Sequence, residues 1–128
     1  MNYKTCIYIS VRRAFNKISK LYDSGLSTLN IKITQYSVLK NIQNLGNPSV
    51  IELSQRLALE RSTVLFNLYK LKKMGLITYK KSRIIKIKII FLTDIKIKKL
   101  YEAEVLWKKT QKNLNALGLK NENNFIHL

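Results

Sequence analysis

The stretch that decides the fold is residues 49–93, which read SVIELSQRLALERSTVLFNLYKLKKMG (49–75) and then LITYKKSRIIKIKIIFLT (76–93). Its first four residues have the S-x-x-E spacing of a capping box. In that motif Ser49 and Glu52 satisfy backbone N–H groups that a helix start leaves without partners. A short helix is therefore expected to begin here and to stop around Ala58-Leu59.

A second helix is expected from Glu60-Arg61 to Gly75, with the acidic residue near its positive dipole end. Its apolar residues fall on one face, namely Val64, Leu68 and Leu71. The remaining positions are expected to point outward: Arg61, Ser62, Thr63, Phe66, Asn67, Lys70 and Lys73. Two helices joined by a short turn can place the start of the second helix on base edges in the major groove. The residues predicted to contact DNA are Arg61, Ser62, Thr63, Asn67 and Lys70, with Asn67 suited to an adenine edge.

A β-hairpin is expected next, from residues 76–81 and 84–92, with Lys81-Ser82-Arg83 near its tip. In the second segment Ile85, Ile87, Ile89 and Phe91 alternate with Lys86 and Lys88, which predicts one packed face and one face directed toward an anion. This hairpin would be the wing of a winged helix. The residues predicted to contact DNA from the wing are Lys80, Lys81, Arg83, Lys86 and Lys88.

Two helices are expected before this stretch. Residues 3–22 carry an amphipathic helix, because apolar residues recur every three or four positions, at Ile7, Val11, Ala14, Ile18 and Leu21. Asp23-Ser24-Gly25 is expected to break that pattern, and residues 26–32 to form a turn or a short helical piece. The next helix should begin at Thr34, whose hydroxyl is a good cap, and end at Gly46-Asn47-Pro48.

Helical spacing returns after Asp94 in a heptad-like seam of Leu100, Ala103, Trp107, Thr110, Leu114 and Leu117. A single helix with such a seam needs a partner, and the expected partner is a second copy of the chain. The residues predicted to form a dimer interface are Ile7, Val11, Leu100, Ala103, Trp107, Leu114 and Leu117. A ligand pocket around Trp107 is the less favoured alternative.

The charge of the chain points to a polyanionic partner. Lysine and arginine total 24 against seven acidic residues, which gives a formal net charge of +17 over 128 residues. Nucleic acid is preferred over a membrane surface, because the cations are spread along the chain rather than gathered on one amphipathic helix. A lysine-rich composition from an AT-rich genome is an alternative source of part of this charge.

Several pieces of the sequence fall in the order and spacing of the MarR family of winged-helix transcription regulators, which the chain resembles over about nine tenths of its length. These pieces are Gln35-Tyr36-Ser37-Val38-Leu39, Glu52-Leu53, Leu57, Arg61-Ser62-Thr63-Val64, Leu71, Gly75-Leu76-Ile77 and Leu92-Thr93, with Cys6, Arg12-Arg13-Ala14, Tyr22-Asp23, Trp107 and Gln111 outside them. The resemblance implies a homodimeric DNA-binding protein, usually a repressor that binds a palindromic operator and is released by a small molecule or an oxidant.

The expected fold is mainly α with a small antiparallel hairpin, in one domain of residues 1–128. Residues 34–92 would form the DNA-binding part, and residues 3–30 and 94–118 the dimerisation helices. Three positions depart from the family pattern. Ile84-Ile85-Lys86 stands where the wing usually carries Asp-Arg-Arg, Phe66 where many relatives have arginine, and Lys96 where a glycine is common.

Cys6 is a candidate redox sensor, with a small buried apolar residue as the alternative. Lys4, Tyr3, Tyr8 and Tyr22 are the groups that would favour its thiolate. The only histidine, His127, has no cysteine cluster beside it, and no enzyme motif was found. We therefore expect no metal, no cofactor, no catalytic activity and no membrane segment, and a single cysteine fits a reducing cytoplasm.

Two alternatives to a specific regulator remain. A basic protein that binds DNA or RNA by shape and phosphate contacts would share the charge and the helix-turn-helix. A protein that pairs with another regulator would use the same seam with a different chain. The operator, the target genes and the effector are not readable from the sequence.

Overall fold

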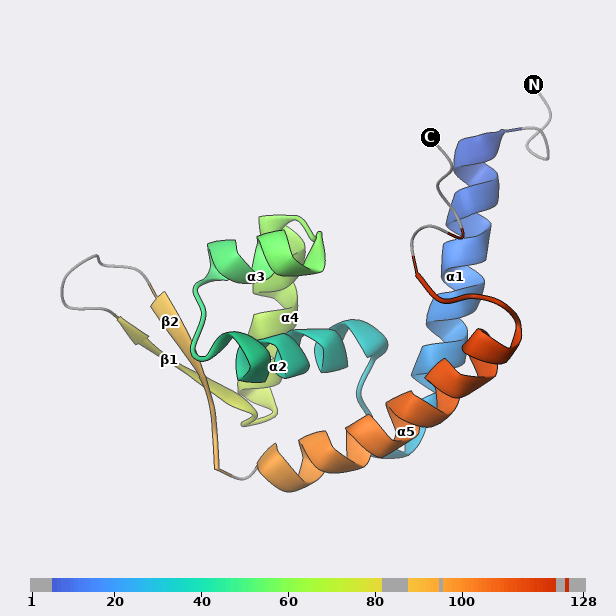
Figure 1. Ribbon diagram of the computed structural model, residues 1–128. Helices are drawn as coiled ribbons and strands as arrows, with labels where there is room; N and C mark the ends of the chain where they lie inside the picture. The colour runs from blue at the N-terminus through green and yellow to red at the C-terminus, as the bar shows by residue number, and fades with distance from the viewer. Residues whose placement is uncertain (1–5, 82–87, 95, 122–123, 125–128) are drawn as a thin grey trace.

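The computed structural model describes residues 6–81, 88–94, 96–121 and 124, and its side chains except those of residues 88, 96 and 97. The elements, in chain order, are α1 (Ile7–Gly25), a 3₁₀ turn η2 (Ser27–Leu29), α2 (Ile33–Leu45), α3 (Val50–Leu57), α4 (Arg61–Lys73), β1 (Ile77–Lys81), β2 (Lys88–Leu92) and α5 (Lys96–Ala116). Helices α2, α3 and α4 and the hairpin form one end of the molecule, and α5 leads from the hairpin to α1 at the other (Figure 1). A mainly helical winged-helix fold is thus confirmed.

The helix-turn-helix forms where local chemistry predicts it. The Glu52 N–H donates to the Ser49 hydroxyl at 3.3 Å, and the Ser49 N–H donates to the Glu52 carboxylate at 3.2 Å. This reciprocal pair satisfies donors at the start of α3. The helix ends at Leu57 because Ala58 adopts a left-handed conformation, with φ of 52°. The predicted turn before Arg61 is confirmed.

The predicted bounds of the first two helices need correction. Helix α1 continues through the expected break at Asp23 and ends at Gly25. Asp23 does not end α1, because its side chain instead caps the start of α2. Its carboxylate accepts the Ile33 N–H at 2.8 Å, and the Gln35 side chain accepts the Lys32 N–H at 2.9 Å. Helix α2 therefore begins at Ile33, and Thr34 is not its cap. The short 3₁₀ turn between the two helices was expected.

The wing is a two-stranded antiparallel sheet, but its packed face was predicted in the wrong phase. Ile77 pairs with Leu92, and Tyr79 pairs with Ile90, so these four residues share one face. Ile90 is fully buried, and its N–H donates to the Pro48 carbonyl at 3.0 Å. Ile89 and Phe91 are only half-buried. Ile85, Ile87 and the expected tip at residues 82 and 83 lie outside the described residues.

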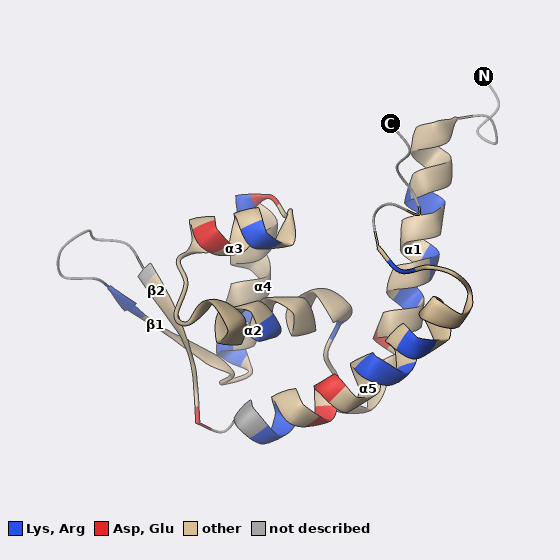
Figure 2. Cartoon of the chain, in the orientation of Figure 1, with Lys and Arg blue, Asp and Glu red and all other residues tan. Residues whose placement is uncertain are grey.

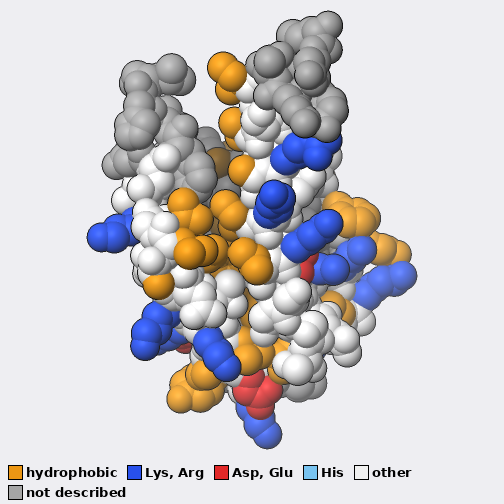
Figure 3. All heavy atoms as spheres, turned by 90° about the vertical axis from the view of Figure 1, so that its right-hand side faces the viewer, with side chains coloured by type: hydrophobic (Ala, Val, Ile, Leu, Met, Phe, Trp, Pro, Cys, Tyr) orange, Lys and Arg blue, Asp and Glu red, His pale blue; other side chains and the backbone are white. Residues whose placement is uncertain are grey.

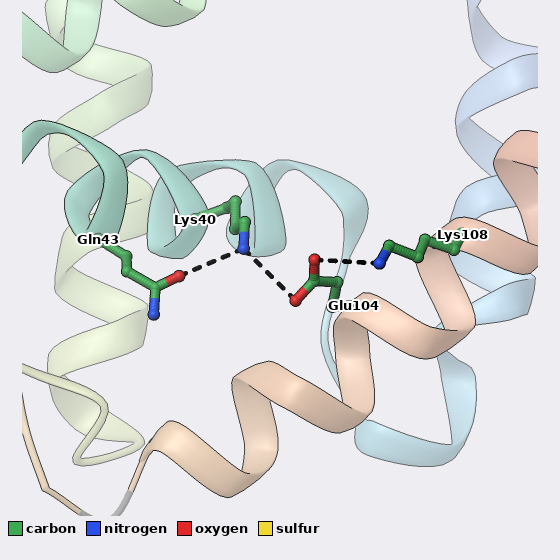
Figure 4. Close-up of polar contacts among 4 residues, drawn as sticks. All are labelled: Lys40, Gln43, Glu104 and Lys108. Atoms are coloured by element: carbon green, nitrogen blue, oxygen red, sulfur yellow. Dashed lines mark hydrogen bonds and ion pairs between the residues drawn. The ribbon is translucent and has the colours of Figure 1, made fainter.

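One core joins the winged-helix elements to the first half of α5. Its buried members include Val38, Leu39, Ile42, Leu53, Val64, Leu68, Leu71, Ile77, Ile90, Leu100 and Ala103. Lys40 of α2 lies 3.4 Å from the Glu104 carboxylate, and Lys108 lies 3.6 Å from it (Figure 4). These pairs are partly exposed, and each contributes at most about 1 kcal/mol.

The predicted dimer seam on α5 is therefore partly wrong. Leu100 and Leu114 are each 5% exposed and Ala103 is fully buried, all within a single chain. Trp107 is half-buried, and its ring centre lies 6.0 Å from that of Tyr36. These side chains pack within the same chain because α5 folds back on α2 and α1. In the described part of the chain, none of the helices combines the length and the apolar character needed to cross a membrane.

Candidate nucleic-acid interface

The outward face of α4 begins with polar residues, as predicted. Arg61, Ser62 and Thr63 are all exposed at the start of the helix, next to Glu60 at the N-cap position. Val64, Leu68 and Leu71 are fully buried on the opposite side. The start of α4 is therefore held by the core and open to solvent, which is the geometry that a groove-binding helix requires.

Asn67 is a correction to the predicted interface. Its side chain is turned toward the core, with 8% of the residue exposed. The Asn67 Nδ2 donates to the Thr63 carbonyl one turn earlier, at 2.8 Å. A buried amide on the core side of the helix cannot lie on an adenine edge, because that contact needs both the amide oxygen and an amide N–H in the groove.

Apolar side chains occupy the outward face that follows these polar residues. Leu65 is 49% exposed, Phe66 58% and Tyr69 57%. The sequence indicates an outward position for Phe66 but not for Leu65 and Tyr69, because apolar residues are expected to be buried. The signal that marks the aromatic pair is the i, i+4 spacing of Phe66 to Lys70 and of Tyr69 to Lys73.

Lysine ammonium groups lie over aromatic rings across this surface. Lys70 lies 4.6 Å from the Phe66 ring centre, and Lys73 lies 4.9 Å from that of Tyr69. The wing repeats the arrangement, with Lys72 4.9 Å from the Tyr79 ring and Lys80 5.1 Å from the Phe91 ring. Such contacts direct the cations without neutralising them, so their charge remains available to an anion.

The base of the wing is fastened to the end of α4. The Thr93 hydroxyl donates to the Gly75 carbonyl at 2.7 Å, and the Thr93 N–H donates to the Leu76 carbonyl at 3.2 Å. Lys80 and Lys81 are exposed on β1. The other predicted wing contacts, Arg83, Lys86 and the Lys88 side chain, lie outside the described residues. Basic residues also occur on α1, α3 and α5 (Figure 2).

An open groove of about 560 Å³ separates α4 from the wing. It is lined by Val50 at the start of α3, by Leu65, Tyr69, Lys72 and Lys73 of α4, and by Tyr79 of β1. Its lining is mostly apolar and includes two lysines. Burial raises the pKa of the Tyr79 phenol above its ordinary value of 10.

The surroundings of Cys6 differ from those proposed for a thiolate. Cys6 is half-buried at the N-cap position of α1 and is not in a disulfide. Tyr22 donates its hydroxyl to Gln111 of α5, and the Tyr8 hydroxyl accepts from Arg12 at 3.0 Å. Tyr22 therefore does not serve the sulfur. Tyr3, Lys4 and His127 lie outside the described residues. The described residues contain no cluster of side chains suited to a metal ion.

A second cavity of about 250 Å³ lies where α1 meets the winged-helix elements. Its lining comes from α1, α2 and the end of α3, and includes Phe15, Ile18, Tyr22, Ile33, Ser37, Leu57 and Leu59. Most of these side chains are apolar.

No protein-family model and no curated protein sequence matches the chain. Among solved structures, the M. tuberculosis transcriptional regulator MosR in complex with DNA is 29% identical, with a TM-score of 0.78 over 87% of this chain and 81% of that one. MosR in a second structure is 26% identical, with a TM-score of 0.79 over 96% and 89%. The Streptomyces coelicolor transcriptional regulator PcaV, in complex with its natural ligand, is 19% identical, with a TM-score of 0.79 over 97% and 87%.

The fold and the exposed α4 surface beside the hairpin define a winged-helix protein. Within that class, the chain is similar in fold to the transcriptional regulator MosR, in agreement with the MarR-family resemblance of its sequence. MosR and PcaV, the proteins of these structures, are transcriptional regulators.

Proposed function

We propose that this protein is a sequence-specific DNA-binding transcriptional regulator, acting as a homodimeric repressor on a palindromic operator. The observation that carries the proposal is the start of α4, which is exposed beside a basic wing strand. Arg61, Ser62, Thr63 and Lys70 are the proposed contacts from α4, and Lys80, Lys81, Arg83, Lys86 and Lys88 those from the wing. The DNA complex of MosR supports the same use of the fold.

The proposed dimer uses α1 and the end of α5. Helix α1 has an amphipathic sequence, yet none of its residues is buried in the single chain. Ile7 is 80% exposed, Val11 59% and Leu117 74%. Hydrophobic side chains gather on this side of the molecule (Figure 3), where a groove of about 450 Å³ runs between the ends of the two helices. An exposed apolar face of this kind is typical of an interface. A dimer with a two-fold axis through this face would match a palindromic operator.

A Val11→Asp variant tests the dimer. Val11 is exposed in the single chain, so we expect the fold to survive while the buried charge prevents association. Native mass measurement should show a dimer for the parent protein and a monomer for the variant. Lys20→Gln, also on an exposed part of α1, is the matched control and should remain dimeric. A monomeric parent protein would refute the proposed assembly.

For release from the operator, we propose a small organic effector in the cavity between α1, α2 and α3. A molecule there would touch both the dimerisation helix and the winged-helix elements, so it could bias their relative position. The ligand complex of PcaV supports a ligand-controlled regulator.

Oxidation at Cys6 is the second proposed route of release. If it operates, peroxide should weaken DNA binding in the parent protein but not in Cys6→Ser. Equal loss in both proteins would refute that route.

Selection of bound duplexes from a random pool tests the central proposal. A specific regulator should enrich one two-fold symmetric site and prefer it to bulk DNA by about a thousandfold or more. The competing function is a non-specific architectural DNA-binding or RNA-binding protein, which the widely spread charge favours. Equal affinity for all duplexes, or tighter binding to RNA, would establish that alternative and refute the regulator.

A further inference from the structure

The outward face of α4 has few groups that can read a base through hydrogen bonds. Beyond its first turn, the exposed positions are occupied by Leu65, Phe66, Tyr69 and lysines. The only amide in this helix, Asn67, is committed to the Thr63 carbonyl. Apart from the lysines and the Tyr69 hydroxyl, this face therefore offers a groove mainly apolar contacts.

The lysines around these apolar side chains indicate which surface covers them. Lys70 and Lys73 flank the aromatic rings at 4.6 Å and 4.9 Å, and Lys72 lies at the edge of the groove lined by Leu65. An apolar protein surface or a lipid tail would have to bury these cations without a counter-charge, which is costly. A duplex instead offers phosphates at the rim and an apolar group in the floor of its major groove.

That apolar group is the 5-methyl of thymine, which projects into the major groove and is absent from the other three bases. We propose that Phe66 is a specificity-determining residue that recognises thymine through its 5-methyl group. This inference rests on the proposed insertion of α4 into the major groove and names the base that the insertion reads. Phe66 lies one turn after Ser62 on the same outward face, so its ring reaches the groove floor when the start of α4 enters.

The test replaces thymines of the selected duplex, one symmetric pair at a time, by deoxyuridine. Uracil keeps the base pair and lacks only the methyl group. Loss of one buried methyl group corresponds to ~0.8 kcal/mol, or about fourfold in affinity. We therefore expect the dissociation constant to rise about fourfold per half-site, and about 15-fold for a symmetric pair. 5-Bromodeoxyuridine, which fills the same space, should restore binding.

A Phe66→Ala variant shows whether the methyl group meets this ring. Phe66 is largely exposed, so the variant should fold, and we expect it to bind the thymine and uracil duplexes with equal affinity. Tyr101→Ala is the matched control, because Tyr101 is an exposed aromatic residue on α5. It should retain the full thymine preference.

The outcomes separate this inference from the proposed function. If a symmetric site is selected but no thymine position responds to uracil, or Phe66→Ala keeps the full response, thymine reading is overturned and the regulator stands. If single-stranded DNA binds more tightly than any duplex, the rings act as stacking platforms instead, and thymine reading is again overturned. If no duplex is preferred at all, both the proposed function and this inference fail.

Discussion

At the scale of single residues, the direction of one side chain decides what α4 can recognise. Asn67 has the chemistry of an adenine reader, but its amide bonds to the Thr63 carbonyl and its side chain faces the core. Phe66, the preceding residue, is the one that faces outward. The sequence shows both residue types, and only packing against α2 and α3 separates their roles.

Substitution of Asn67 should therefore affect stability and not recognition. In Asn67→Ala the lost hydrogen bond and packing should lower the free energy of unfolding by about 1 kcal/mol. The affinity of the folded protein for its operator should change by less than about threefold. Arg61→Ala should do the reverse, with about tenfold weaker binding and unchanged stability. Urea unfolding would measure the change in stability, and fluorescence anisotropy the change in DNA affinity. A larger loss of affinity in Asn67→Ala than in Arg61→Ala would contradict the assigned roles.

The raised pKa of Tyr36 predicts a loss of stability at high pH. Burial, with a smaller effect of the Glu104 carboxylate, raises its pKa from 10 to about 12. Between these values an unfolded tyrosine has released its proton while Tyr36 still holds it, so rising pH favours unfolding. The contribution is fully present below pH 10 and is lost as the pH rises through about 12.

The urea midpoint should fall between pH 10 and pH 12, and it should fall less steeply in Tyr36→Phe. Glu104→Gln is the control and should keep most of the fall, because burial is the larger cause of the shift. If the parent protein and Tyr36→Phe have the same pH profile, the raised pKa is not coupled to folding.

At the scale of elements, one close approach sets how α1 meets α5. Gly25 is the last residue of α1, and a Cβ there would collide with the Thr110 hydroxyl of α5. Thr110 Oγ1 itself donates to the Leu106 carbonyl at 3.4 Å. The absence of a side chain at Gly25 thus allows the end of α1 to lie close to α5.

Gly25→Ala should destabilise the protein by about 1–3 kcal/mol through this overlap, although alanine favours a helix by about 0.5–1 kcal/mol. The double variant Gly25→Ala/Thr110→Ala removes the colliding oxygen and should recover the stability of Thr110→Ala alone. Thermal unfolding of the four proteins forms a double-mutant cycle. Additive effects would show that the two positions do not meet.

The elements themselves were largely predictable, and so was the buried face of α4, but the packed faces of β2 and α5 were not. The predicted start and end of α3 are confirmed, because its caps use residues within the same turn. The packed face of β2 was predicted one residue out of phase, since isoleucine occurs on both faces of the strand and the pairing of Tyr79 with Ile90 decides which enters the core. Leu100 of α5 fits a dimer seam by spacing alone, but its own chain covers it.

At the scale of the whole molecule, a net charge of +17 predicts a strong dependence of DNA binding on salt. If the dimer neutralises about six to ten phosphates, its affinity should fall by about a thousandfold or more between 50 and 200 mM salt. Each phosphate contact removed should lower the slope of log affinity against log salt by about 0.9.

The wing lysines test which cations contribute to this slope. Lys80→Gln/Lys81→Gln removes two exposed cations of β1 from each protomer and should reduce the slope by up to about 3.6 in a dimer. Lys17→Gln/Lys20→Gln removes the same charge from α1 and should leave it nearly unchanged. Equal reductions in both variants would show that the whole molecule, rather than the wing, attracts the DNA.

The sequence by itself determined the helix-turn-helix, the presence of a wing and the basic character of the chain. The capping bonds of α3 and the turn residues depend on residue types within a few positions, and net charge depends on composition alone. These features can therefore be read without a structure. Only the tertiary structure decided that Asn67 faces inward, that Ile90 fills the core, and that Leu100 and Ala103 serve their own chain. Burial depends on which distant segments come together, and no local pattern contains that information.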